Sequence, residues 1–100
     1  MRYPRGPEDD APLAEVGAKV KVQGVVEGHH QGGAVVQIPT AGGGAMGVPT
    51  DLEDLDVGDP AELEGTVVKT TRSTIVVAFE TPDGATQQTA LDPQRVTVEP

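Results

Sequence analysis

The sequence predicts an all-β fold, and two observations carry this prediction. The first is an internal repeat, because Val16-Gly17 recurs 41 residues later as Val57-Gly58. The second is a period of two near the start of each copy, where apolar and polar residues alternate as in a strand with one buried face. We therefore expect two tandem β units over residues 16–56 and 57–100, preceded by an N-terminal arm of residues 1–15.

The repeat extends through both copies without a gap. At the same spacing, Gly24 matches Gly65, and Val35-Val36 matches Val76-Val77. Other equivalent positions are apolar in both copies without being identical: Val22 and Leu63, Ile38 and Phe79, and Leu55 and Val96. We therefore expect the two copies to form the same strands in the same order.

The first strand of each unit is expected around residues 20–26 and 61–67, where the alternation is clearest. Gly24 and Gly65 fall on the apolar face of these strands. A missing side chain at such a position permits a sharp bend or the close approach of another backbone, as at the corner of a small barrel.

Each unit is expected to continue with two further strands, one helical turn and a short closing strand. The second strands are rich in β-branched residues, and residues 81–84 have the Pro-Asp-Gly chemistry of a tight reversal. The polar segments 50–55 and 91–96 suit a single helical turn. The expected second strands are residues 34–38 and 75–79, the third strands 45–48 and 85–90, and the closing strands 55–57 and 96–98.

This order of elements resembles the SH3-like small β-barrel. The resemblance covers residues 16–98 as two copies, and it rests on the Val-Gly openings, the mid-strand glycines and the Asp-led turns before each last strand. It implies two tandem SH3-like barrel units. The aromatic residues with which SH3 domains bind proline-rich peptides have no counterpart, since Phe79 is expected in the core, so peptide binding of that type is disfavoured.

Composition limits both the core and the class of function. One tyrosine, one phenylalanine and no cysteine or tryptophan occur among 100 residues, so the core must be aliphatic and no disulfide can support it. Association with partners is the expected source of further stability. Sixteen acidic and seven basic residues give a net charge of -9, which disfavours binding to nucleic acid or to anionic lipid.

The segment EGHHQGG, residues 27–33, holds both histidines side by side. Adjacent side chains of an extended backbone point to opposite faces, and a zinc site needs three or four converging ligands. The equivalent residues 69–73 offer no usual metal ligand, so we expect hairpin tips that contact proteins, with a metal or catalytic role as the alternative for the histidines. The expected contact residues of the two tips are His29, His30, Thr70, Thr71 and Arg72.

An acidic run from Asp51 to Glu64 suggests a calcium loop. Such a loop needs glycine at its sixth position, but counting from Asp54 the sixth residue is Asp59, and the glycine comes one place early at Gly58. We expect a solvated acidic surface between the two units, with a weak cation site or contact with a basic partner as alternatives.

The N-terminal arm is rich in proline and shows no hydrophobic period, so we expect it to be extended or disordered in isolation. It carries Tyr3 between Arg2 and Arg5. We expect the arm to become ordered on a neighbouring subunit, with the tyrosine as anchor and the arginines meeting carboxylates. A flexible terminus without a docking role is the alternative.

These observations predict a non-enzymatic structural or assembly protein that binds other protein subunits, with no cofactor, no metal, no direct nucleic-acid contact and no membrane contact. Small, duplicated, Val-, Gly- and Asp-rich barrels of this kind resemble minor virion proteins of tailed bacteriophages of GC-rich hosts, which serve in capsid decoration or head-to-tail joining. The resemblance implies an oligomeric assembly with capsid or connector subunits, in the virion or the host cytoplasm, without a signal peptide. The alternative is an intracellular regulatory adaptor whose SH3-like barrels bind protein or nucleic acid.

Overall fold

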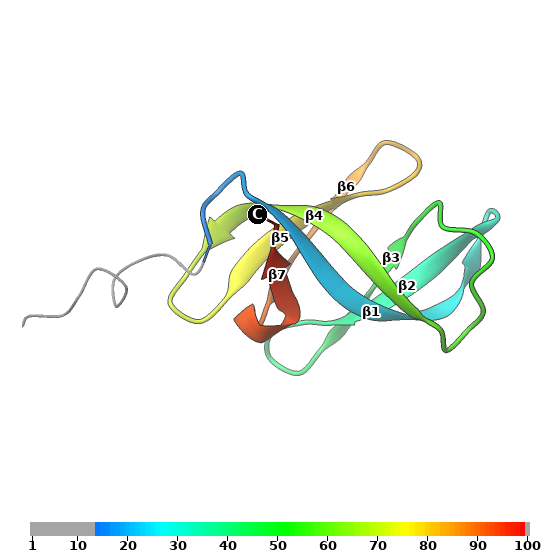
Figure 1. The fold of residues 1–100 in the computed structure, drawn as a ribbon, viewed down its shortest axis with the longest axis horizontal. Helices are drawn as coiled ribbons and strands as arrows, with labels where there is room; N and C mark the ends of the chain where they lie inside the picture. The colour runs from blue at the N-terminus through cyan, green and yellow to red at the C-terminus, as the bar shows by residue number, and fades with distance from the viewer. Residues whose placement is uncertain (1–13, 100) are drawn as a thin grey trace, which may run out of the picture.

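In the computed structural model, residues 14–99 are described and form a single antiparallel sheet of seven strands. The sheet is strongly twisted and curls into a nearly closed barrel (Figure 1). The all-β fold class is therefore confirmed, and no α-helix occurs within these residues. The elements are β1 (Lys19–His30), β2 (Gly33–Pro39), β3 (Ala45–Pro49), β4 (Pro60–Thr70), β5 (Ile75–Glu80), β6 (Thr86–Leu91), the 3₁₀ helix η1 (Pro93–Arg95) and β7 (Val96–Val98).

The two longest strands, β1 and β4, pair at the centre of the sheet. Their antiparallel register places Val22 opposite Leu63, which are equivalent positions of the 41-residue repeat. The sheet order is β3-β2-β1-β4-β5-β6, and β7 adds to β1. The first and second halves of the chain are thus joined through a ladder centred on equivalent residues.

Further backbone contacts recur at the same spacing. The Gly17 N–H donates to the Val67 carbonyl at 2.7 Å, and the Gly58 N–H donates to the Val26 carbonyl at 2.9 Å. Both long strands carry a bulge immediately after these carbonyls, at equivalent positions. The residue that precedes the first strand of each half is therefore hydrogen-bonded to the long strand of the other half.

The barrel is brought towards closure by a contact between the two ends of the sheet order. The loop between β2 and β3 reaches β6, where the Ala41 N–H donates to the Ala90 carbonyl at 2.9 Å. This bond joins the β2–β3 loop to β6, the last strand of the sheet order, and Figure 1 shows how the sheet curls.

The core is aliphatic except for Phe79, as expected from the composition. Alternate residues of β1 and β4 point inward, and every fully buried residue among residues 14–99 is apolar or glycine. Ala14, which the sequence assigns to the arm, is also buried. The buried core residues are Ala14, Val20, Val22, Val26, Ala34, Val36, Ile38, Val48, Ala61, Leu63, Val67, Ile75, Val77, Phe79 and Leu91.

The two halves differ in how they end. The expected helical turn and closing strand are present in the second half as η1 and β7, but the same expectation is wrong between β3 and β4. Pro93 favours the turn in the second half because its ring fixes φ at a helical value, whereas Leu52 stands at the equivalent place. The Ala34 N–H donates to the Leu52 carbonyl at 2.9 Å, and Asp54 has a left-handed φ of 64°, so this segment follows another path.

Gly24 and Gly65 lie where a second backbone crosses the inner face of the sheet. A Cβ atom on Gly24 would stand 2.6 Å from the Gln37 carbonyl oxygen and 2.6 Å from Val36 Cγ1, and one on Gly65 would stand 2.9 Å from the Ala78 carbonyl oxygen. The equivalent close approach in both halves explains why glycine interrupts each apolar face.

We predict that Gly24→Ala lowers the free energy of unfolding by about 1–3 kcal/mol, because the added methyl group overpacks this contact. Gly28→Ala is the matched control, since a Cβ there meets nothing within 4 Å, and its effect should stay within about 0.5 kcal/mol. Urea unfolding followed by circular dichroism measures the free energy of unfolding of the two variants. Equal effects of the two substitutions would contradict the close approach at Gly24.

Candidate functional site

The first hairpin tip is a two-residue turn between β1 and β2. Gln31 and Gly32 both have positive φ, 53° and 86°, and His30 pairs with Gly33 across the turn. Positive φ at both central residues is the geometry that matches the twist of the flanking strands. The two histidines are the last residues of β1 and are exposed, as expected for a hairpin tip.

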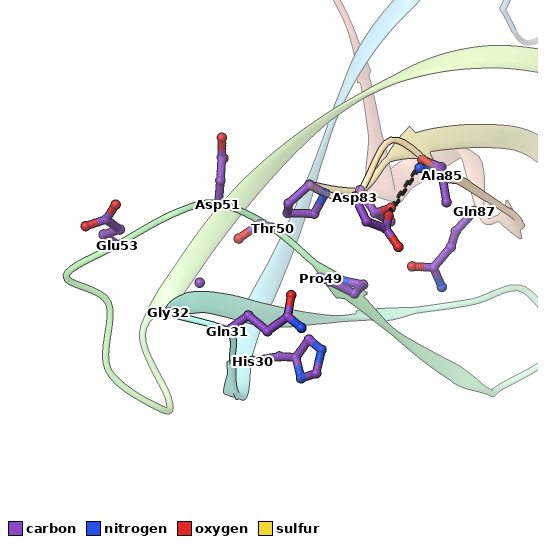
Figure 2. Close-up of a pocket in the computed structure, with 13 residues that line it drawn as sticks. His30, Gln31, Gly32, Pro49, Thr50, Asp51, Glu53, Asp83, Ala85 and Gln87 are labelled. Atoms are coloured by element: carbon purple, nitrogen blue, oxygen red, sulfur yellow. Dashed lines mark hydrogen bonds between the residues drawn. The ribbon is translucent and has the colours of Figure 1, made fainter.

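The two histidines have different surroundings. His29 Nε2 lies 2.6 Å from the Leu55 carbonyl oxygen, and because a carbonyl can only accept, Nε2 carries the hydrogen. His30 lies on the other side and lines a cleft (Figure 2). His29 is therefore hydrogen-bonded to the segment between β3 and β4, whereas His30 lines an open cleft.

The second tip lies between β4 and β5 and is ordered by its own hydrogen bonds. Thr70 ends β4, and the Thr71 hydroxyl accepts hydrogen bonds from the N–H groups of Ser73 and Thr74 at 3.3 and 3.0 Å. Arg72 is exposed at this tip. The tip presents hydroxyl groups and one guanidinium, where the first tip presents imidazole and amide groups.

The two tips lie at opposite ends of the sheet, with the β1–β2 turn at the right and the β4–β5 turn at the left of Figure 1. The structure brings together the predicted contact residues within each tip, but not those of different tips. Arg2, Tyr3 and Arg5 lie outside the described residues. The protein-binding role of all these residues stays a prediction.

A cleft of about 620 Å³ separates the first tip from the loop between β5 and β6 (Figure 2). Its origin is visible in the repeat, because Pro82 stands at the position equivalent to Ala41 and Pro49 at that of Ala90. Pro82 has no N–H group, so the hydrogen bond that joins Ala41 to Ala90 cannot form there. Both prolines line the cleft that remains open.

The loop that borders this cleft is fixed by Asp83. Its carboxylate accepts hydrogen bonds from the Thr81 hydroxyl and from the Ala85 N–H, the latter at 3.2 Å. The Thr81 hydroxyl, and then the Ala85 N–H, hold the pKa of Asp83 below its ordinary value, because both stabilise the ionised form. A negative charge therefore stays at the rim of the cleft.

A second cleft of about 390 Å³ lies beside β4 and shares Thr50, Asp51, Thr81 and Pro82 with the first. We call the two together the acidic groove. Among the described residues that line it, none is a lysine or arginine. Its carboxylates are Asp51, Glu53, Glu62, Glu64, Glu80 and Asp83.

Glu64 also faces Glu99, which follows β7. The Glu64 carboxyl, through a shared hydrogen bond, together with burial and the Glu64 charge, raises the pKa of Glu99 above its ordinary value. One Glu99 carboxylate oxygen is buried without a hydrogen-bond partner. The surroundings of Glu99 therefore favour the protonated form of its carboxyl.

The groove was not predicted from the sequence, although the acidic run contains several of its residues. The signal that could have revealed it is a difference between the two copies, since Ala41 becomes Pro82 and Leu52 becomes Pro93 at equivalent positions. No group of three His, Cys, Asp or Glu side chains within residues 14–99 is arranged to hold a metal ion. No helix among the same residues is long and apolar enough to cross a membrane.

Comparison of the chain with protein-family models, with curated proteins and with solved structures finds no match.

We predict that His29→Ala lowers the free energy of unfolding by about 0.5–1 kcal/mol, because it removes the bond to the Leu55 carbonyl. His30→Ala is the matched control and should leave stability unchanged within error, since no hydrogen bond holds His30 in the described part of the chain. Urea unfolding of the two variants under the same conditions measures the difference. Indistinguishable stabilities would show that the His29 contact does not hold the segment.

We predict that Glu99→Gln raises the melting temperature at pH 7, because it removes a carboxylate whose ionisation Glu64 opposes. A raised carboxyl pKa means that the folded state binds the proton more tightly than the unfolded state, so wild-type stability rises as pH falls through this pKa. The advantage of the variant should therefore shrink between pH 7 and pH 4. Thermal unfolding across this range tests it, and an advantage that did not change with pH would contradict the assigned cause.

Proposed function

We propose that the chain is a non-enzymatic assembly protein that binds other protein subunits at two separate surfaces. The observation that carries this proposal is the placement of two chemically different tips at opposite ends of one continuous sheet (Figure 1). A rigid element with different contact groups at its two ends is suited to joining two partners.

The proposal includes the finer architecture, in which the chain consists of two tandem SH3-like units that share the β1–β4 ladder. Its support is the recurrence of hydrogen bonds, bulges and close glycine contacts at a spacing of 41 residues. A duplicated unit can keep its scaffold in both copies while its tips and loops diverge.

The partners in this proposal are capsid or connector subunits of a tailed bacteriophage, in which the chain serves as a decoration or head-to-tail joining protein. The support for this partner class is the resemblance of the sequence to such proteins. The thin aliphatic core and the acidic surface fit a protein that is stabilised by its neighbours.

An adaptor that binds nucleic acid is the second candidate, and Lys69 and Arg72 near the second tip favour it. The two candidates differ in salt dependence. Binding of a nucleic acid would weaken steeply between low and physiological salt because phosphate contacts release counterions.

We predict that deletion of residues 1–13 reduces the mass of the assembly formed by the full chain, because it removes Arg2, Tyr3 and Arg5. The deletion stops before Ala14, which belongs to the core. A full chain with Glu8→Gln, Asp9→Asn and Asp10→Asn is the matched control and should keep its assembly state.

Sedimentation velocity over a range of protein concentrations measures the mass of the assembly that each variant forms. An unchanged assembly state after the deletion would overturn the docking role of the arm.

A further inference from the structure

The outer edge of β4 lacks the strand that covers the equivalent edge of β1. Lys21 of β1 pairs with Thr97 of β7, and the Glu99 N–H donates to the Lys19 carbonyl at 3.0 Å. On β4, the residue equivalent to Lys21 is Glu62. Within residues 14–99, β4 pairs with β1 along one edge and with β5 along the other from Thr66 onward, so no strand covers this edge near Glu62.

The uncovered edge has backbone groups available for pairing and space beside them. In an antiparallel ladder, the N–H and C=O of one residue point to the same side and alternate along the strand. Glu62 therefore directs both groups to the open side, as Lys21 does towards β7. The acidic groove runs along this side between Glu62–Glu64 and Thr50–Leu52.

The charge of the groove defines the strand that fits it. Glu99 follows β7, and its N–H donates to the Lys19 carbonyl, so its carboxyl lies on the side of the sheet that carries Lys19 and Lys21. On β4 the charge has the opposite sign, because Glu62 stands at the position of Lys21 and further carboxylates line the groove. Lys21 lies 3.7 Å from Glu62 and offsets one of these charges, which leaves the groove acidic. The complementary strand therefore carries a basic residue at the place that Glu99 takes after β7.

We propose that the open edge of β4 binds the N-terminal arm of a second copy of this chain as an added antiparallel strand, with Tyr3 at the place of Thr97 and Arg5 at the place of Glu99. Tyr3 then lies opposite Glu62, and Arg5, which lies opposite Pro60, is the diagonal neighbour of Glu62 on the same face of the sheet. Pro4 takes the place of Val98, whose N–H points away from the ladder, so its missing donor costs no hydrogen bond. This inference rests on the proposed docking role of the arm and names its receptor.

The direction of the strand favours a second copy over the same molecule. An added strand antiparallel to β4 runs towards Pro60, whereas the described chain begins near Val67, to which Gly17 is hydrogen-bonded. These two positions on β4 are roughly 23 Å apart. The link from Arg5 to Ala14 spans roughly 30 Å when fully extended, which leaves little length for a reversal of direction.

Charge reversal in the full chain tests the pairing. The arm variant carries Arg2→Glu and Arg5→Glu, and the groove variant carries Glu62→Lys and Glu64→Lys. Each alone should weaken self-association by roughly tenfold or more, and an equimolar mixture of the two should restore it in mixed assemblies. Glu15→Lys with Glu27→Lys is the matched control, since both residues are exposed and outside the groove.

Sedimentation velocity measures association, thermal unfolding checks that each variant is folded, and amide hydrogen exchange at Glu62 gives a readout within the wild-type chain. The Glu62 amide should be protected at high protein concentration and should lose protection on dilution. If the arm variant dissociates but the groove variant associates as wild type does, this inference is wrong and the docking role of the arm stands.

If deletion of residues 1–13 leaves association unchanged, both the docking role of the arm and its placement in the groove are wrong. Protection of Glu62 that does not depend on concentration would place the arm in its own groove and overturn the second-copy assignment.

Discussion

The rest of the structure depends on the antiparallel ladder between β1 and β4. Its register sets Val22 against Leu63 and thereby decides which side chains of both strands face the core. A slip by one residue would turn every buried valine of β1 to solvent, which an aliphatic core of this size could not tolerate. The bonds from Gly17 to Val67 and from Gly58 to Val26 fix the same register from both ends.

The features of functional interest arise where the second half departs from the first. Pro82 in place of Ala41 removes a closing hydrogen bond and leaves a cleft, and the path of the chain between β3 and β4 leaves the outer edge of β4 uncovered. The repeated contacts form the scaffold, and the unrepeated ones form the groove.

The strands could be predicted from the sequence because their period of two and their turn residues are local signals. Phe79 was correctly placed in the core for the same reason. The path of residues 50–57 could not be predicted, because it depends on contacts of Thr50 and Leu52 with Ala34 across the sheet. Barrel closure through Ala41 and Ala90 is likewise a contact between distant segments, so the groove became visible only when the equivalent residues of the two halves were compared in space.

The acidic surface connects binding to stability. Glu64 opposes the ionisation of Glu99, and Glu62 and Glu64 both line the groove. Lys21 lies 3.7 Å from the Glu62 carboxylate and balances one of these negative charges. A basic segment in the groove would relieve part of this repulsion while binding only the folded chain, and it would therefore stabilise the fold by mass action. Because these groups are exposed, their contribution is screened by salt. In the proposed assembly, the arm of a second copy would supply both a strand for the open edge of β4 and positive charge for the groove.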